Sequence, residues 1–588
     1  MPARATRVLC RHLMIPLAFL VIFAARAQSP NVIQSTPSQN PNQPQYTLRA
    51  RVPLTILDVV VTDAKGKPVH GLKQSDFTIL EDNKEMTPNS FEERRSDDTP
   101  APAAAPATLD LPPNTFTNTT PAPPTSRPIN ILLIDNLNTP TSVQQIVQKE
   151  MLSFVAKMAP GTRVAVLGMN YHIFMLQGIT SDPELLKAAI TNRKNVSLAP
   201  PLEDAYQDPA NDPPGGIAIP CDTQLEHEAA RIQYTIAAMK QLVRYLGGMP
   251  GRKNLVWFAG SFPLMDRCAD GDAYDLTTEL QSATDSFARA HVAIYPVDPR
   301  ALDALAGGPI ADNGVHNKEV VQRQMNEHLT MESFAEPTGG KAAYTTNDLA
   351  GAAVDAVELG SNFYAITYTP LNQTLDSRFR TIKVQVDQPG LHLTYRNGYY
   401  AIDPGTTLAG AKTDKLTPMQ NALLRGGLDA TQIQFKVRVT QSPGTELALP
   451  VSNQPDAKQM HPPYRHYSLA FAIDINAIDF SPGIDGNYRG DFEFGARVYN
   501  ADGDQIVNAV SKTVSPILPP AVYRSMLRGG ANAHQEIDVP ATGDYFIRIA
   551  VHDLTSDRVG SIEVPTSSIA PETPPAVAAE KPTPATQP

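Results

Sequence analysis

The chain has 588 residues, a formal net charge of −11, 42% hydrophobic residues and 54 prolines. One hydrophobic core stops growing well below this length, so the chain must fold as several domains. No stretch combines basic residues with interleaved aromatic ones, and this excludes nucleic acid as an expected partner. The prolines gather at 30–44, 97–128, 200–220 and 565–588, where they mark linkers and tails rather than domain interiors.

The first 27 residues have the organisation of a secretory signal peptide. Three arginines precede an apolar run from Leu13 to Ala25, and small residues at Ala25 and Ala27 stand where a signal peptidase reads the chain. An N-terminal membrane anchor is the alternative, but the apolar run is short for a membrane span. We therefore expect export to the periplasm, the cell surface or the medium, and no integral membrane part after cleavage.

Shifts in composition predict a succession of segments along the exported chain. They are a disordered spacer at 28–45, a small β-module at 46–95, a Pro-rich linker at 96–128, an α/β domain with a C-terminal β extension at 129–401, a linker at 402–430, an all-β, sandwich-like domain at 431–565 and a disordered tail at 566–588. Both β regions show alternating apolar residues separated by turn sequences, as strands joined by hairpins do.

Residues 129–401 alternate between apolar strands and amphipathic helices. The continuous apolar run at 129–134 suits a strand covered on both faces. Further strands are expected at 163–167, 173–176, 254–258 and 291–297, and helices at 141–158, from 182, at about 225–246 and at about 275–290. Asp182 is the expected N-cap of one helix, with Pro183 at its first position and Leu185 on its apolar face. This alternation predicts a mainly parallel, Rossmann-type sheet with helices on both faces.

Several blocks of sequence occur in a fixed order through this region. They include Asp58-Val59-Val60-Val61-Thr62-Asp63, Ile131-Leu132-Leu133-Ile134-Asp135-Asn136-Leu137-Asn138-Thr139, Ile294-Tyr295-Pro296-Val297-Asp298-Pro299-Arg300, Tyr364-Ala365-Ile366-Thr367-Tyr368-Thr369-Pro370 and Arg396-Asn397-Gly398-Tyr399. Together they resemble the von Willebrand factor A-related (VWFA-like) domain family of acidobacteria, over about residues 50–401. The resemblance implies an α/β fold and an extracytoplasmic protein, and it implies little about activity.

The resemblance also implies a divalent cation, such as Mg²⁺, at the carboxyl edge of the sheet, held by oxygen ligands from three loops. Asp135 takes the first ligand position, Leu137 replaces the first expected serine and Thr139 replaces the second. The candidate ligands are Asp135, Asn138, Thr139 and Thr180. The third loop lacks its carboxylate, so the site is degenerate. Two interpretations stay open: a weak or altered cation site, or a loop in which these residues cap the following helix.

Other residues are expected around the same edge of the sheet. Asn136, Ser261 and Asp298 are the candidates for a binding rim because each follows a predicted strand. Cys221 and Cys268 are the two cysteines left after export and form a disulfide candidate in an oxidising compartment. The sequence does not show whether the two thiols meet.

The sequence offers no catalytic residue set, so we do not expect an enzyme. No P-loop and no G-x-S-x-G elbow is present, and the zinc-protease pattern that begins at His227 has Arg231 in place of its second histidine. The first hypothesis is an exported binding or adhesion-type protein that engages a protein or a surface glycan. A metal-free structural or assembly scaffold of the cell envelope is the second, and a hydrolase is the third.

Overall fold

The computed structural model describes residues 54–96, 111–119, 127–139, 141–192, 221–260, 265–267, 273–299, 316–344, 346–402, 416–442, 463–503 and 505–570. The predicted signal peptide, the spacer at 28–45 and the tail beyond 570 lie outside the described residues. Within the described ranges, no helix combines the length and the hydropathy needed to cross a membrane.

A five-stranded sheet forms the centre of the α/β domain, in the order β12-β9-β6-β7-β8. Its strands are β6 (Ile129–Asp135), β7 (Val164–Met169), β8 (Ile173–Thr180), β9 (Lys253–Phe258) and β12 (Val292–Val297). Four of them run parallel, and β8 closes one edge as the antiparallel partner of β7. Every residue of the parallel strands is buried, as expected for strands covered on both faces. The predicted α/β architecture is thus confirmed.

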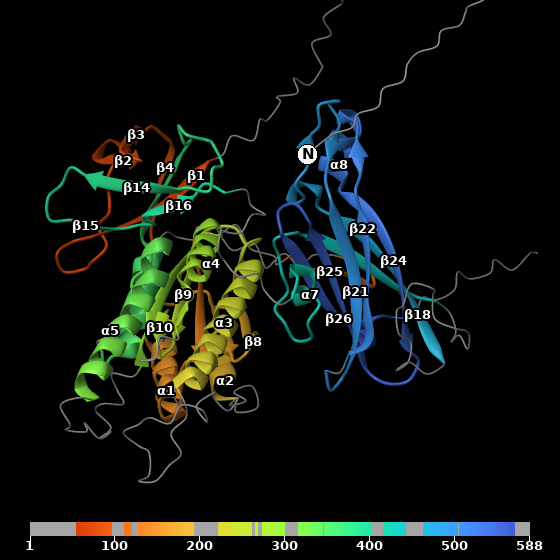
Figure 1. The fold of residues 1–588 in the computed structure, drawn as a ribbon, viewed down its shortest axis with the longest axis horizontal. Helices are drawn as coiled ribbons and strands as arrows, with labels where there is room; N and C mark the ends of the chain where they lie inside the picture. Colours follow the sequence, from red (N-terminus) through yellow and green to blue (C-terminus); the bar gives the residue numbers. More distant parts are fainter. Residues whose placement is uncertain are drawn as a thin grey trace, which may run out of the picture. The chain divides into compact units, whose positions relative to one another are not determined.

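Helices cover both faces of this sheet (Figure 1). On one face, α3 (Cys221–Leu246), α4 (Thr277–Arg289) and α5 (His316–Ala335) pack against side chains such as Leu133 and Trp257. On the other face, α1 (Thr141–Lys157), α2 (Pro183–Thr191) and α6 (Leu349–Ser361) pack against side chains such as Leu132. The connection from β9 to α4 contains a small hairpin of β10 (Met265–Arg267) and β11 (Ala273–Asp275).

The start of α2 follows the sequence prediction closely. The Asp182 carboxylate accepts a hydrogen bond from the Glu184 N–H at 2.9 Å, and Pro183 occupies the first helical position. Leu186 and Ile190 are buried, as expected for the apolar face. Leu185, which was predicted on the same face, is 48% exposed because one residue of helix turns its side chain by about 100° toward solvent.

Strands that precede and follow the α/β domain in the sequence combine into one two-sheet β domain. The sheets are β15-β1-β13-β4 and β16-β14-β2-β3. Their bounds are β1 (Thr55–Thr62), β2 (Phe77–Glu81), β3 (Lys84–Met86), β4 (Pro88–Arg94), β13 (Phe363–Tyr368), β14 (Phe379–Val386), β15 (His392–Thr394) and β16 (Gly398–Tyr400). One apolar core lies between the sheets.

This pairing differs from the predicted layout, in which residues 363–400 extend the α/β domain. β13 instead pairs antiparallel with β1 on one side and with β4 on the other. The burial of β14 alternates from residue to residue, which suits a strand with one face on a core and the other in solvent. A strand of that kind fits a two-sheet domain better than a sheet covered on both faces.

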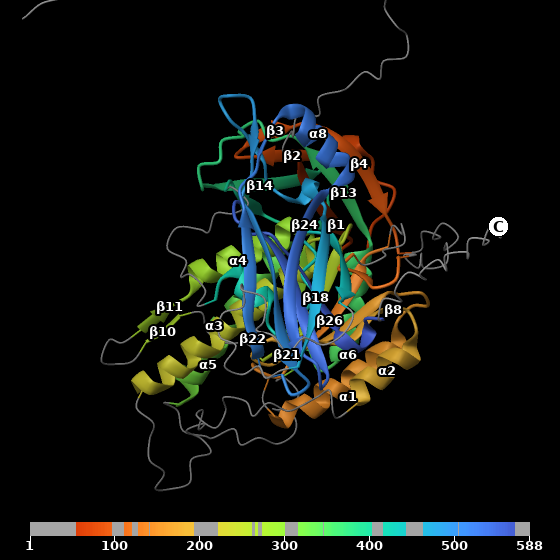
Figure 2. The ribbon, with the colours of Figure 1, turned by 90° about the vertical axis from the view of Figure 1, so that its right-hand side faces the viewer.

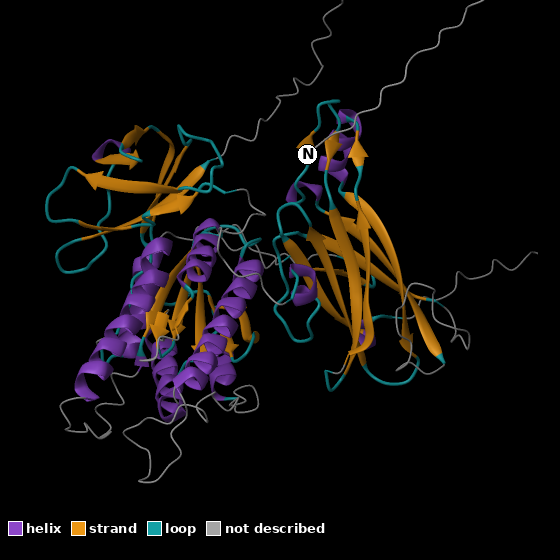
Figure 3. Cartoon of the chain, in the orientation of Figure 1, coloured by secondary structure: helices purple, strands orange, loops and turns teal. Residues whose placement is uncertain are grey.

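The C-terminal domain is built almost entirely of strands (Figure 3). Two four-stranded sheets, β24-β18-β17-β5 and β22-β21-β25-β26, share one core, and a small sheet, β19-β20-β23, adjoins them. Figure 2 shows the long strands β18, β21 and β22 of this domain. The bounds are β5 (Thr115–Thr117), α7 (Pro418–Ala422), β17 (Phe435–Gln441), β18 (Tyr464–Ile473), β19 (Ser481–Pro482), β20 (Tyr488–Arg489), β21 (Phe492–Asn500), β22 (Gln505–Val514), β23 (Ile517–Leu518), α8 (Pro520–Gly529), β24 (Ala531–Pro540), β25 (Tyr545–Asp553) and β26 (Val559–Pro565). β5 and α7 lie in segments predicted as linkers.

Candidate functional site

Asp135 stands at the carboxyl end of β6 and is fully buried. It shares the sheet face of Leu133, because side chains two residues apart on a strand point the same way. Trp257 lies opposite Leu133 on the neighbouring strand β9. Its indole N–H reaches forward and donates a hydrogen bond to Asp135 Oδ2 at 3.0 Å.

Asn138 donates two further hydrogen bonds to this carboxylate. Its backbone N–H donates to Asp135 Oδ1 at 2.8 Å, and its side-chain amide donates to Asp135 Oδ2 at 2.7 Å. The same amide donates to Thr235 Oγ1 of α3 at 2.9 Å. Thr139 Oγ1 accepts from the Gly260 N–H, at the end of β9, at 3.2 Å. These residues therefore tie the loop after β6 to β9 and α3.

The donor set of this loop does not fit a divalent cation. Asp135 is its only carboxylate, and both of its oxygens already face N–H donors. The side-chain oxygens of Asn136, Asn138 and Gln144 are buried without a hydrogen-bond partner, but neutral amides are weak substitutes for the anionic oxygens that Mg²⁺ and Ca²⁺ prefer. Across the described ranges, no three His, Cys, Asp or Glu side chains are grouped as a metal site would need.

Burial raises the pKa of the Asp135 carboxyl to about 6. The hydrogen bonds from Asn138 and Trp257 and the positive charge of Arg231 act in the opposite direction and lower this pKa. Near neutral pH the group is thus ionised and enclosed, and N–H groups of Asn138 and Trp257 donate to it. Such a carboxylate organises its loop and presents no free oxygen to a ligand.

The structure does not bring Thr180 to Asp135. Asp135 pairs with Met169 at the carboxyl end of β7, whereas Thr180 pairs with Val164 at the amino end of the same strand. The two predicted ligands therefore lie at opposite edges of the sheet. The cause is the antiparallel direction of β8, which carries the end of this strand away from the candidate site.

The predicted rim residues lie at the expected edge, but their side chains are covered. Asn136 follows β6 and Asp298 follows β12, and both are about 2% exposed. Ser261 and Cys268 lie outside the described residues, as does the side chain of Cys221, whose backbone begins α3. The disulfide therefore stays a prediction.

Three residues that the sequence did not single out as binding groups stand at the same edge. Tyr171 lies in the turn between β7 and β8, and Tyr234 and Arg231 lie on α3 beside Thr235. Tyr171 and Tyr234 are 42% and 45% exposed, with ring centroids 5.3 Å apart and planes at 72°. We call Arg231, Tyr234 and Tyr171 the rim cluster. The sequence carried one sign of this cluster: Tyr171 lies in a tight hairpin turn, where small and polar residues are more usual than a large aromatic one.

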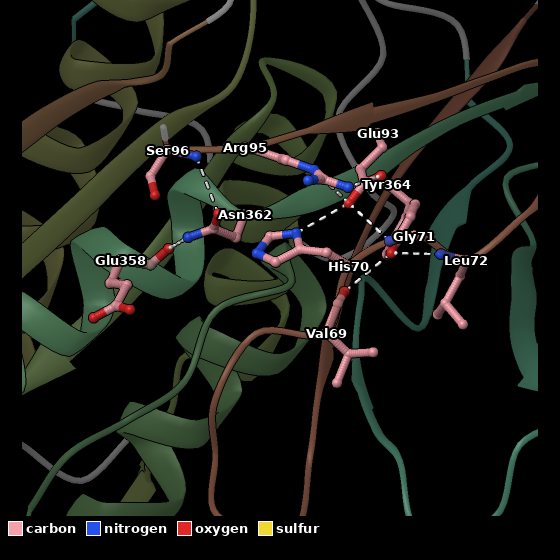
Figure 4. Close-up of polar contacts among 10 residues, drawn as sticks. All are labelled: Val69, His70, Gly71, Leu72, Glu93, Arg95, Ser96, Glu358, Asn362 and Tyr364. Atoms are coloured by element: carbon pink, nitrogen blue, oxygen red, sulfur yellow. Dashed lines mark hydrogen bonds and ion pairs between the residues drawn. The ribbon is translucent and has the colours of Figure 1, made fainter. Parts of the chain in front are cut away.

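A second polar cluster lies in the β domain around Glu93 of β4 (Figure 4). Its carboxylate accepts hydrogen bonds from the Gly71 N–H at 3.1 Å and from two Arg95 nitrogens at 2.9 Å, and His70 Nδ1 lies 3.0 Å away. Burial works to raise the pKa of Glu93, yet the hydrogen bonds from Arg95, Gly71 and His70 hold it below its usual range. The Tyr364 hydroxyl binds the same loop. All these groups satisfy one another, so the cluster fastens a loop.

A buried ion pair connects Asp58 of β1 with Arg252, the residue directly before β9. Arg252 donates to Asp58 at 3.3 Å, to the Tyr295 hydroxyl at 3.2 Å and to the Gly339 carbonyl at 3.2 Å. Burial acts to raise the pKa of Asp58, but His291 and Arg252 hold it below its usual range. Each partner is compensated, as a buried charge in a stable structure must be.

No family model matches the sequence, and no curated protein matches it either. Among solved structures, the chain is similar to a von Willebrand factor type A protein from Catenulispora acidiphila, with 9% identity over 84% of this chain and 75% of that one and a TM-score of 0.22. It is also similar to the ArnB paralog VWA2 from Sulfolobus acidocaldarius, with 10% identity over 87% of this chain and 74% of that one and a TM-score of 0.20. A third is the conserved hypothetical protein BatB from Bacteroides thetaiotaomicron, with 10% identity over 40% of this chain and 98% of that one and a TM-score of 0.21. Likeness at this level says nothing about function, and the α/β fold rests on its own strand order and helices.

Proposed function

We propose that this chain is an exported binding protein whose von Willebrand A-like domain engages a protein partner at the carboxyl edge of its sheet without a metal ion. The observation that carries the proposal is the engagement of Asp135 by three N–H donors from Asn138 and Trp257. A carboxylate bound in this way has both oxygens occupied by hydrogen-bond donors, so the edge keeps its shape without a cation.

The place of the proposed contact follows from the topology of the sheet. Ligands of open α/β sheets bind outside the carboxyl ends of the strands. Here that edge carries two exposed tyrosines, whereas Asn136 and Asp298 are covered. Tyrosine and arginine are the residue types most enriched among the energetically dominant contacts of protein interfaces. The secretory pattern of the first 27 residues supports an extracytoplasmic partner.

Site-specific photo-cross-linking in the producing bacterium tests this proposal. A benzophenone amino acid replaces Tyr171 at the rim or, as the matched control, Leu185, which is exposed on α2 near the opposite edge. We expect a discrete cross-linked protein from position 171, unchanged by EDTA, and none from position 185. A metal-free scaffold with no rim contact predicts no product at 171, and loss of the product in EDTA contradicts metal independence.

A further inference from the structure

We infer that the rim cluster binds a carboxylate on an acidic segment of the partner protein, with Arg231 as the anchoring cation. This inference rests on the proposed function and specifies the chemistry of its partner. It follows from the position of Arg231, from the absence of a direct ion pair to it among the described residues and from the two aromatic rings beside it.

Arg231 lies one helical turn outward from the Asp135 loop. Thr235, which holds Asn138, donates its hydroxyl hydrogen bond to the Arg231 carbonyl at 3.0 Å. α3 begins at the carboxyl edge of the sheet and ends before β9, so residues earlier in the helix stand closer to solvent at this edge. The side chain of Arg231 therefore extends from the outer end of the contact between α3 and the loop.

Arg231 is half-buried as a residue, and within the described part of the chain its side chain makes no hydrogen bond or ion pair. Asp135 is close enough to feel its charge, but the Asp135 oxygens are already engaged by Asn138 and Trp257. A guanidinium with free donors favours an incoming anion. Its planar fork matches the two oxygens of a single carboxylate.

Tyr234 follows Arg231 at the three-residue spacing that places side chains next to each other on a helix. Tyr171 meets Tyr234 edge to face, and this contact fixes both rings although each is more than two-fifths exposed. Rigid tyrosines bury much apolar area at a small entropic cost. The cluster thus offers one cation beside a firm aromatic surface, which suits an acidic residue with apolar neighbours.

A protein segment fits this surface better than an anionic glycan does. Within the rim cluster, Arg231 alone carries a permanent positive charge. Its neighbour His172 is kept neutral near pH 7, because burial lowers the pKa of the ring. A polyuronate repeats its charges along the chain and needs several cations, whereas one acidic side chain needs one.

The test measures binding of the full exported chain to immobilised nine-residue peptides with a central Asp or Glu and neutral flanks. The same peptides with Asn or Gln, and oligogalacturonate, are the comparison probes. We expect selective binding of the acidic peptides, reduced roughly tenfold or more by Arg231→Gln and by Tyr234→Ala, as for interface hot spots. Arg231→Lys should bind less than wild type, because an ammonium lacks the planar fork. Lys149→Gln, which removes an exposed cation from α1 on the other face of the sheet, should bind like wild type.

Each other outcome contradicts the inference in a defined way. Equal binding of acidic and amide peptides, or an equal loss in Lys149→Gln, removes the role of Arg231, provided that circular dichroism shows every variant folded. Binding of oligogalacturonate alone, lost in Arg231→Gln, replaces the peptide with a glycan. If the cross-link at position 171 persists without acidic selectivity, only this inference fails. If the cross-link is absent as well, the proposed function fails with it.

Discussion

Asp135 was predicted as a metal ligand, yet its surroundings are those of a structural carboxylate: it is buried and both of its oxygens accept hydrogen bonds. The indole N–H of Trp257 is one of its three donors. Trp257→Phe keeps an aromatic ring in the core and removes this hydrogen bond. Asp135 Oδ2 keeps its hydrogen bond from Asn138, so only the contribution of the indole hydrogen bond is lost. We expect the free energy of unfolding to fall by about 1.5–3 kcal/mol, as is usual for a hydrogen bond to a charged group. Urea unfolding followed by circular dichroism measures it, because Trp257 is the only tryptophan and its fluorescence is lost in the variant.

A double-mutant cycle with Asp135→Asn separates the hydrogen bond from the change in ring size. If the bond is responsible, Trp257→Phe costs less when Asp135 is already replaced. An identical cost in both backgrounds would assign the effect to packing of the smaller ring. It would mean that the indole hydrogen bond does not stabilise the loop after β6.

His552 of β25 sits between two carboxylates and is nearly inaccessible. Its Nδ1 lies 2.9 Å from Glu493 and its Nε2 lies 3.1 Å from Asp557. Burial lowers the pKa of His552, but hydrogen bonds with Asp557 and Glu493 outweigh it, so the pKa lies above the ordinary value. The folded state therefore binds the proton more tightly than the unfolded state does. This stabilisation is fully present below the unfolded pKa and is lost as the pH rises through the folded one.

His552→Gln should therefore destabilise the protein more at about pH 5.5 than at about pH 9. Urea unfolding at both pH values measures the difference. The matched control is His534→Gln, because His534 also lies near a carboxylate but is exposed. We expect the control to show little change at either pH. A cost for His552→Gln that does not vary with pH would mean that the ring is held for its shape rather than its charge.

At the scale of single elements, the short strand β5 is anchored in the C-terminal domain by the side chain of one residue, Asn118. Asn118 follows it directly and is buried. Its amide donates to the carbonyls of Ala430 and Ile433 at 2.7 and 2.8 Å and accepts from the Phe435 N–H at 3.0 Å. Asn118→Ala leaves the Ile433 carbonyl and the Phe435 N–H without the Asn118 partner, whereas the Ala430 carbonyl keeps the Ser561 N–H. We therefore expect a loss of about 3 kcal/mol in unfolding free energy. Thr115→Ala, on the same strand but half-exposed, should cost well under half as much; equal costs would contradict the anchoring role.

The sequence predicted those elements whose burial leaves a local pattern. β6 is a continuous apolar run, and α2 has both its N-cap and its proline, so their positions were evident. β5 reads Thr-Phe-Thr within a Pro/Thr-rich stretch and β24 is largely polar, so neither stands out from a loop. No local pattern reports which distant strand is a partner, and for this reason the place of β13 between β1 and β4 was not predicted.

The residues of the candidate site likewise fall into those that the sequence predicted and those that it did not. Asp135 was predicted because a motif surrounds it in the sequence. Its contact with Trp257 depends on the register between β6 and β9, which the sequence does not contain. Thr180 was placed at the wrong edge because nothing in its sequence reports that β8 runs antiparallel. The rim cluster depends on residues that are distant in the sequence meeting in space, as Tyr171 and Tyr234 do across 63 positions.

For the whole molecule, the decisive feature is that the α/β domain is inserted into the β domain. The chain leaves the β domain after β4, contributes β5 to a sheet of the C-terminal domain, runs through the α/β domain and returns at β13, the strand next to β4. The two crossing points adjoin each other, since the Ser96 N–H donates to Asn362 Oδ1 at 3.0 Å (Figure 4). Insertions are tolerated where the ends of the inserted domain lie close together. The β domain therefore exists only when both of its halves are present.

Truncation tests this architecture directly. A fragment spanning 53–402 contains both halves of the β domain, and we expect it to be monomeric and to unfold cooperatively. A fragment spanning 129–402 keeps β13 and β14 but lacks β1, β2 and β4, so it exposes Tyr364, Ile366 and Tyr368 together with unpaired strand edges. We expect this fragment to bind a hydrophobic dye strongly and to aggregate in size-exclusion chromatography.

A fragment spanning 127–362 lacks strands β13 to β16 and should bind less dye and aggregate less than 129–402. If 129–402 proved monomeric and as stable as 53–402, strands 363–400 would have to pack on the α/β domain itself, and the inserted arrangement would be wrong.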